Sequence, residues 1–247
     1  MLQARLWPLR FLEVYPHNGG TARLRMRGIA DDGMPYFMKR ADPPGVPATE
    51  LLCSGLANAI GLAVPYFHIG LLPEDDEEVF ASRQEAGLAD SLTWFQNLVA
   101  HPCPANVARQ LSAWFAFDLF INNPDRHVNN FLCRDVADVQ TVHGFDFSEA
   151  LLQEPWPPSP ALRPACNTLR TRQVLAMNGV PLDRNVALEH LERLDAVPAD
   201  WMGNAVTEVP AAWMDDATRA ELARWWREDR APRLESIKQD IRNGAYN

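Results

Sequence analysis

The first eighty residues of the chain alternate between apolar and polar positions, which is the period-two pattern of half-buried β-strands. The segments are separated by turn sequences such as Asp31-Asp32-Gly33. One segment instead carries Leu51, Leu52 and its other apolar residues at helical spacing. The pattern predicts one helix at residues 48–61 and strands at residues 9–15, 22–27, 36–39, 66–72 and 79–82.

After residue 82 the pattern changes, because a polar break at Gly87 is followed by long stretches with helical periodicity. The segment 105–121 is apolar nearly all round, as is typical of a buried helix. We expect a short hairpin at residues 131–142, a proline-rich loop at 155–164, and helices near 90–100, 105–121, 169–177, 186–196, 198–206 and 215–242. The pattern predicts an α+β fold, with an antiparallel sheet and one helix in residues 1–84 and a mostly helical part in residues 85–247.

Composition and charge exclude several classes of protein to which the chain could otherwise belong. A chain of 247 residues with 47% hydrophobic and 22% charged residues matches a folded globular domain, which excludes a disordered or fibrous protein. Its net charge of −9 argues against a general attraction to nucleic-acid phosphates, so we expect no direct nucleic-acid binding. No stretch approaches the roughly 20 apolar residues of a membrane span. The first fifteen residues lack the apolar run of a secretory signal, so we expect a cytoplasmic protein.

The strongest local motif is a dense polar run at residues 122–130, directly after the apolar helix and before a predicted strand. Asp125 and Asn130 are five residues apart, as in the catalytic loop of kinases, where the Asp accepts a hydroxyl proton and the Asn binds Mg²⁺. The alternative interpretation is an Asx-rich turn that ends the helix.

Other residues around this loop favour the catalytic interpretation. Asp146 lies between two aromatic residues at the end of a predicted strand, where a second Mg²⁺ ligand belongs. Lys39 ends the third strand and Glu50 lies near the start of the following helix, the pairing that holds nucleotide phosphates in kinases. Taken alone, Lys39 is explained as a solvated lysine and Glu50 as a partner of its helix dipole.

A glycine turn precedes these residues in the chain. Gly19, Gly20 and Thr21 separate the first two strands, and backbone N–H groups in such a turn can approach phosphates closely. By itself the turn is weak evidence, and the GxGxxG pattern of protein kinases is absent. The order of glycine turn, strand lysine, helix glutamate, Asp-x4-Asn loop and strand-end Asp is the order expected of a two-lobed kinase.

These segments together resemble the HipA-like kinases of the short, kinase-only type, and the loop also resembles the D-R-H-x-x-N loop of lipid kinases. The resemblance covers about residues 11–151 and rests on residues 19–21, 36–39, 50–65, 122–132 and 144–150. It implies a protein-kinase-like fold that binds ATP and Mg²⁺ between an N-lobe, residues 1–84, and a C-lobe, residues 85–247.

The resemblance also implies a role for each matching residue. Asp125 would be the catalytic base, and Arg126 and His127 complete the D-R-H motif, with His127 either orienting the γ-phosphate or fixing the loop. The Mg²⁺ ligands would be Asn130 and Asp146. The nucleotide contacts would be Lys39 with Glu50, the phosphate loop Gly19, Gly20 and Thr21, and the segment 80–84 near the adenine, with Phe80, Ala81 and Ser82. Ser148 departs from the pattern, because many kinases have the Gly of D-F-G at this position.

The implied activity is Mg²⁺-dependent transfer of a phosphoryl group from ATP to a Ser or Thr hydroxyl of a protein, the chain itself included. The alternatives that stay open are a pseudokinase that serves as a binding module, a small-molecule or lipid kinase, and a nucleotidyl transferase on the same fold. Residue types alone do not choose the acceptor, and they do not fix the oligomeric state.

Overall fold

The computed structural model of the chain describes residues 8–16, 26–43, 45–86, 88–89, 91–137, 139–153, 156–158, 162 and 164–246, with the backbone alone at 88–89. The predicted phosphate loop, Gly19, Gly20 and Thr21, lies outside these residues. Among the helices that are described, none is long and apolar enough to cross a membrane.

The first five strands form a closed barrel in the order β1-β2-β3-β5-β4. Their bounds are Leu9–Pro16 for β1, Met26–Ala30 for β2, Pro35–Lys39 for β3, Phe67–Leu71 for β4 and Glu78–Arg83 for β5. The prediction of an antiparallel sheet was wrong in one respect, because β1 and β4 pair in parallel and close the barrel. Gly70 permits this closure, since a Cβ at that position would lie 2.4 Å from the Phe11 ring.

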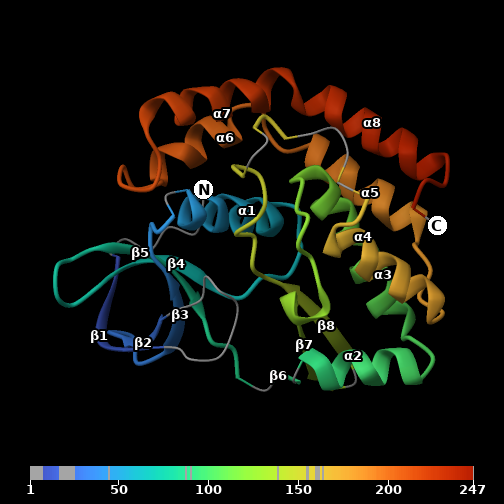
Figure 1. Ribbon diagram of the computed structural model, residues 1–247, viewed down its shortest axis with the longest axis horizontal. Coiled ribbons are helices and arrows are strands. Elements are labelled where there is room, and N and C mark those ends of the chain that lie inside the picture. The colour runs from blue at the N-terminus through green and yellow to red at the C-terminus, as the bar shows by residue number, and fades with distance from the viewer. Residues whose placement is uncertain are drawn as a thin grey trace.

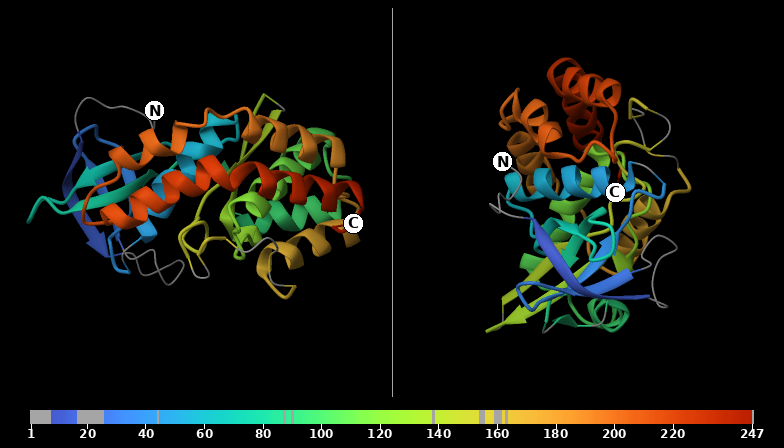
Figure 2. Two further views of the ribbon diagram at one scale, coloured as in Figure 1. Left: turned by 90° about the horizontal axis from the view of Figure 1, so that it is seen from above. Right: turned by 90° about the vertical axis from the view of Figure 1, so that its left-hand side faces the viewer.

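Helix α1, Val46–Ala59, lies between the barrel and helices α6 and α7 (Figures 1 and 2). Its side chains from Val46 to Ala57 are all buried, which explains why its apolar residues surround the helix instead of following one face. The helix follows Gly45, whose φ of 87° is readily adopted only by glycine, and Pro47 occupies its first turn. Its buried position brings Glu50 close to β3.

The second part of the chain is mostly helical. Strands β6, Leu88–Ala89, β7, Phe131–Val136, and β8, Val139–Gly144, form a small antiparallel sheet. The remaining elements are α2 Ser91–Ala100, α3 Ala105–Phe120, α4 Asn167–Met177, α5 Arg184–Asp195, α6 Trp201–Ala205, α7 Asp216–Glu228, α8 Arg230–Arg242 and two 3₁₀ helices, Val128–Asn130 and Val206–Glu208. Helix α3 is buried from Leu111 to Phe120 and packs against α5, α8 and β8.

The helix predicted at residues 215–242 is in fact two helices, α7 and α8, which are separated at Asp229. Pro232 lies in the first turn of α8 and explains the break. Its ring would clash with the carbonyl of Glu228 in a continuous helix, and proline has no N–H to donate. The sequence therefore contained the signal for two helices.

Helix α8 contributes a buried arginine to the end of α3. Arg233 Nε donates to the Phe120 carbonyl at 2.7 Å and Nη2 donates to the Leu119 carbonyl at 2.8 Å. These carbonyls belong to the last turn of α3, where a positive charge is favourable. Burial lowers the pKa of Arg233 to about 10. The end of α3, from which the predicted catalytic loop departs, is therefore fixed by a residue more than a hundred positions later in the chain.

Candidate functional site

The predicted catalytic loop connects α3 to β7. It begins at Asn122, whose φ of 54° turns the chain away from the helix. Asn123 Oδ1 accepts a hydrogen bond from the Asp125 N–H at 3.1 Å, which is an Asx turn. The Asx turn considered as the alternative interpretation is thus present, and it places the Asp125 side chain at a partly exposed position.

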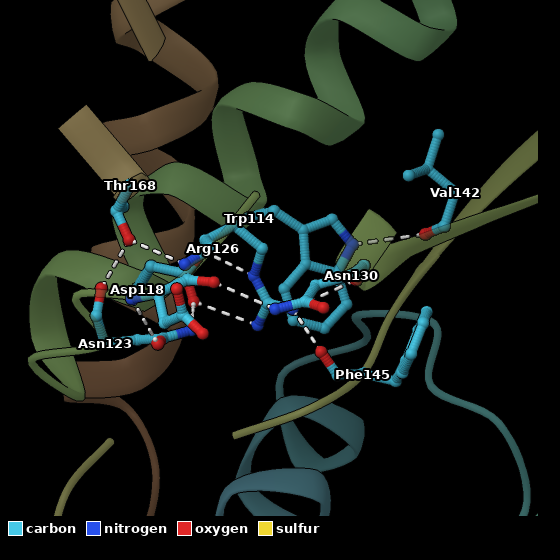
Figure 3. A network of polar contacts seen from close by, with 9 residues as sticks. Trp114, Asp118, Asn123, Arg126, Asn130, Val142, Phe145 and Thr168 are labelled. Atoms are coloured by element: carbon cyan, nitrogen blue, oxygen red, sulfur yellow. Dashed lines mark hydrogen bonds and ion pairs between the residues drawn. The ribbon is translucent and has the colours of Figure 1, made fainter. Parts of the chain in front are cut away.

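Arg126 lies in the centre of this loop and is 2% exposed (Figure 3). Its Nε and Nη2 donate to the two carboxylate oxygens of Asp118 on α3, at 2.9 and 3.0 Å. Asn123 Nδ2 donates to Asp118 Oδ1 at 2.8 Å, so the buried carboxylate has three donors. Burial raises the pKa of Asp118, and the Arg126 charge and these hydrogen bonds act against that rise. The pair is a bidentate ion pair inside the protein.

The other contacts of Arg126 connect the two segments that carry the predicted metal ligands. Its Nη1 donates to the carbonyl of Asn130, at 3.1 Å, and to the carbonyl of Phe145 (Figure 3). The guanidinium also lies over the rings of Phe147 and Trp114, at 4.9 and 5.3 Å from their centroids. Arg126 therefore positions the loop and the Asp146 segment, and its buried guanidinium has its donors directed to protein groups.

The N-terminus of α4 also holds the loop. Thr168 Oγ1 donates to the Asn123 carbonyl at 2.6 Å and accepts from the Arg126 N–H at 2.9 Å (Figure 3). The Thr168 N–H donates to the Pro124 carbonyl at 3.2 Å. Asn167 Nδ2 donates to Asp125 Oδ1 at 2.6 Å. The first turn of α4 thus contacts the backbone and the candidate base of the same loop.

Lys39, Glu50 and Asp146 meet in a buried cluster. Lys39 Nζ lies 2.5 Å from Glu50 Oε1 and 2.7 Å from Asp146 Oδ1, and Lys39 is 7% exposed. Lys39 is therefore not a solvated strand-end lysine. Glu50 Oε1 also accepts from the Phe147 N–H at 2.9 Å, so Glu50 is not a dipole partner of its own helix. The pairing predicted from strand β3 and helix α1 is present and includes the strand-end Asp.

The electrostatics of this cluster favour an ionised Asp146. Burial by itself would raise its pKa, but the Lys39 charge and the hydrogen bonds from Lys39 and Ser148 hold the pKa well below the ordinary value. Burial would lower the pKa of Lys39, and the charges of Glu50 and Asp146 raise it above the ordinary value. Burial raises the pKa of Glu50, against the opposing effect of Lys39. Lys39 is therefore a cation with two acidic partners.

This arrangement predicts how Asp146 contributes to stability as the pH changes. Folding lowers the pKa of Asp146, so its contribution to stability is complete when the pH is above the unfolded pKa of about 4. The contribution is lost as the pH falls through the lower folded pKa. We expect Asp146→Asn to lower the free energy of unfolding at pH 7, and the difference from the wild type to shrink below about pH 4. Urea unfolding of both proteins at several pH values measures this; a difference that does not change with pH would contradict it.

The segment around Asp146 has an unusual backbone. Asp146 has a φ of 60°, in the left-handed region that Asp and Asn adopt more readily than most residues. Ser148 Oγ donates to Asp146 Oδ1 at 2.7 Å. The residue that departs from the D-F-G pattern therefore has a role here, because its hydroxyl orients the Asp146 carboxylate.

Asn130 was predicted to bind Mg²⁺ together with Asp146, and its contacts leave its amide oxygen available for this role. Its Nδ2 donates to the Asp125 carbonyl at 2.9 Å, and its backbone carbonyl accepts from the Phe145 N–H at 3.2 Å. Its Oδ1 is buried and has no hydrogen-bond partner in the described part of the chain. An amide oxygen and a carboxylate fit Mg²⁺, which binds proteins through one or two carboxylates plus substrate phosphates. Across the described ranges, no three His, Cys, Asp or Glu side chains gather into a metal site of their own.

The other predicted residues lie in three places. The His127 side chain is half-buried at the loop. Phe80, Ala81 and Ser82 lie within strand β5, where Phe80 pairs with Lys39. The connection from the barrel to β6 begins only at Gln84, after β5 ends, so it starts later than the expected segment 80–84. Gly19, Gly20 and Thr21 lie outside the described residues.

No protein-family model matches the chain, and no curated protein matches it. The Helicobacter pylori proinflammatory kinase CtkA is similar in structure, with a TM-score of 0.64 and 13% identity over 95% of this chain and 98% of that chain. HipA from the Shewanella oneidensis toxin–antitoxin complex with HipB and operator DNA has a TM-score of 0.55 and 13% identity over 94% of this chain.

The match to HipA spans 65% of the length of that protein. Structural similarity at 13% sequence identity shows a shared fold and does not show a shared activity. The chain has the fold of the HipA-like kinases, which confirms at the level of structure the resemblance that its motifs indicated.

Proposed function

We propose that this protein is an ATP- and Mg²⁺-dependent phosphotransferase, a kinase of the HipA-like type that acts in the cytoplasm. The observation that carries the proposal is the buried contact of Lys39 with both Glu50 and Asp146. A lysine between a helix glutamate and a strand-end aspartate is the arrangement that holds nucleotide phosphates next to a metal ligand in protein kinases. In this proposal the nucleotide lies between an N-lobe, residues 1–84, and a C-lobe, residues 85–247.

The residues on the two sides of the nucleotide have different tasks. Lys39 would contact its phosphates, and the turn at Gly19, Gly20 and Thr21 would cover them. Asp146 and Asn130 Oδ1 would hold Mg²⁺, which supplies neutralisation of the negative charge that develops during transfer. The connection after β5 would lie near the adenine. Catalysis of this kind comes mainly from positioning and charge neutralisation, which suits a site in which the buried Lys39 is paired with both Glu50 and Asp146.

Asp125 would be the base. Its carboxylate is partly exposed at the loop, while the rest of the loop is fixed by Arg126 and Thr168. A carboxylate held next to the γ-phosphate can accept the proton of an incoming hydroxyl. We propose a Ser or Thr of a protein as the acceptor, with the chain itself included. His127 would either orient the γ-phosphate or fix the loop.

Intact-protein mass spectrometry after incubation with Mg²⁺-ATP tests the proposal. Transfer of phosphate adds about 80 Da to the acceptor. The wild-type chain and the acceptors in a cell lysate are compared with Asp146→Ala and with a sample that contains EDTA. We expect the shift in the wild type alone.

Two results would contradict the proposal in different ways. A shift of about 329 Da would identify a nucleotidyl transferase, because AMP is then the transferred group. Binding of ATP with no shift on any acceptor would identify a pseudokinase.

A further inference from the structure

Asn167 is the first residue of α4 and contacts the candidate base from outside its loop. Its Nδ2 donates to Asp125 Oδ1 at 2.6 Å, and the two residues are 42 positions apart in the chain. Both side chains are partly exposed, so the contact lies at the edge of the site and not in the core. Among the described residues, Asp125 Oδ2 has no hydrogen-bond partner, while Oδ1 has Asn167. The two carboxylate oxygens are therefore not equivalent.

The platform that carries Asn167 is rigid. The neighbouring Thr168 is 2% exposed and makes hydrogen bonds to Asn123, Pro124 and Arg126 in the loop. Farther along the helix, the buried Arg172 donates to the carbonyl of Val180. A side-chain amide on such a rigid helix end holds its partner in one orientation, which is what the positioning of a catalytic group requires.

We propose that Asn167 is a positioning residue for phosphoryl transfer, which holds Asp125 Oδ1 so that Oδ2 faces the acceptor hydroxyl. The inference rests on the proposed kinase function and names a residue that the motifs do not contain. In the transfer step, the hydroxyl oxygen bonds to the γ-phosphorus and the hydroxyl proton passes to Asp125 Oδ2. The bond from the γ-phosphorus to the β–γ bridging oxygen breaks, and its electron pair leaves with ADP.

Two substitutions separate this role from a structural one. Asn167→Ala removes the side chain, and Asn167→Asp keeps its shape but replaces the donor with a carboxylate next to Asp125. An acidic residue in the first turn of a helix is favourable for the helix dipole, so Asn167→Asp leaves α4 in place. Asn178→Ala is the matched control, because Asn178 caps the other end of α4 with a hydrogen bond to the Val174 carbonyl at 2.8 Å.

The readout is the rate of ADP release from Mg²⁺-ATP, which counts transfer to every acceptor, together with KM for ATP and Tm. We expect both Asn167 variants to lower kcat by about 10- to 100-fold, since small displacements of a catalytic group have effects of this size. KM for ATP and Tm stay near the wild-type values, and Asn178→Ala keeps the wild-type kcat.

Three results would overturn the assignment. If both variants keep the wild-type kcat while Asp125→Asn is inactive, Asn167 has no positioning role and the kinase proposal stands. If kcat falls only together with Tm, or if Asn167→Asp is as active as the wild type, the residue is structural. A wild-type chain that releases no ADP would overturn the proposed function and this role with it.

Discussion

We expect Asp125→Asn to lower the rate of the proposed phosphoryl transfer by about 10²- to 10⁴-fold, the range that a general base contributes, and to leave Mg²⁺-ATP binding unchanged. An amide does not accept the hydroxyl proton, but it has the shape of the carboxylate. The Asp125 backbone makes hydrogen bonds with the side chains of Asn123 and Asn130, and these bonds do not involve the carboxylate that is replaced. We therefore expect the fold and the proposed metal site to stay intact and only the proposed chemical step to be lost.

The measurement is the initial rate of ADP release, with Mg²⁺-ATP binding by calorimetry and Tm as accompanying readouts. Asp135→Asn is the matched control, since it makes the same chemical change at an exposed aspartate of β7. A rate for Asp125→Asn equal to that of the control would assign the base to another residue. A loss of nucleotide binding would show instead that Asp125 belongs to the nucleotide site.

Arg126→Met lowers the free energy of unfolding by about 3–5 kcal/mol, the cost of breaking a buried ion pair by removing one partner. Methionine fills the apolar space beside Trp114 and Phe147, but Asp118 then keeps a buried charge with only Asn123 as donor. Asp118 is 0% exposed in the intact protein, so its carboxylate depends on protein donors. The contacts to the Asn130 and Phe145 carbonyls are also lost.

Urea unfolding of Arg126→Met and the wild type measures the difference in the free energy of unfolding, and a second substitution tests its cause. Adding Asp118→Asn to Arg126→Met removes the uncompensated charge, and we expect it to restore a large part of the stability. The control is Arg224→Met, which breaks a surface ion pair with Glu228 and changes stability by about 1 kcal/mol or less. If Arg126→Met behaves like this control, the buried pair does not stabilise the loop.

The pH dependence of Arg126→Met gives an independent check. Without the guanidinium, burial raises the pKa of Asp118 further above its unfolded value. A carboxyl group with a raised folded pKa stabilises the protein at low pH and loses that contribution as the pH rises. The variant therefore approaches the wild type in stability as the pH falls from 7 toward about 5. A gap that widens over this range would contradict the explanation.

The residues of the site that lie in short motifs were predictable from the sequence. Lys39, Glu50, Asp125, Asn130 and Asp146 stand at spacings and element ends that chemistry constrains, and the structure places Lys39 against both Glu50 and Asp146. Most of the helical elements were predicted for a similar reason, because their periodicity is local, but residues 215–242 form two helices instead of the one expected. Their functional roles stay predictions until activity is measured.

Other features depend on contacts that no short pattern records. Asn167 and Thr168 are ordinary polar residues at the start of a helix, and only the fold brings them to the predicted catalytic loop. The parallel pairing of β1 and β4 joins segments about sixty residues apart. Asp118 did carry a signal, since a single acid in an apolar helix predicts a buried partner.

The cap that Arg233 places on α3 has a consequence for how the protein is made. During synthesis, α3 and the loop after it leave the ribosome long before residue 233 is added. Until α8 arrives, the carbonyls of Leu119 and Phe120 lack the cation that ends their helix in the finished protein. In the nascent chain, the last turn of α3 and the loop that follows it therefore remain without this cap until α8 has been synthesised.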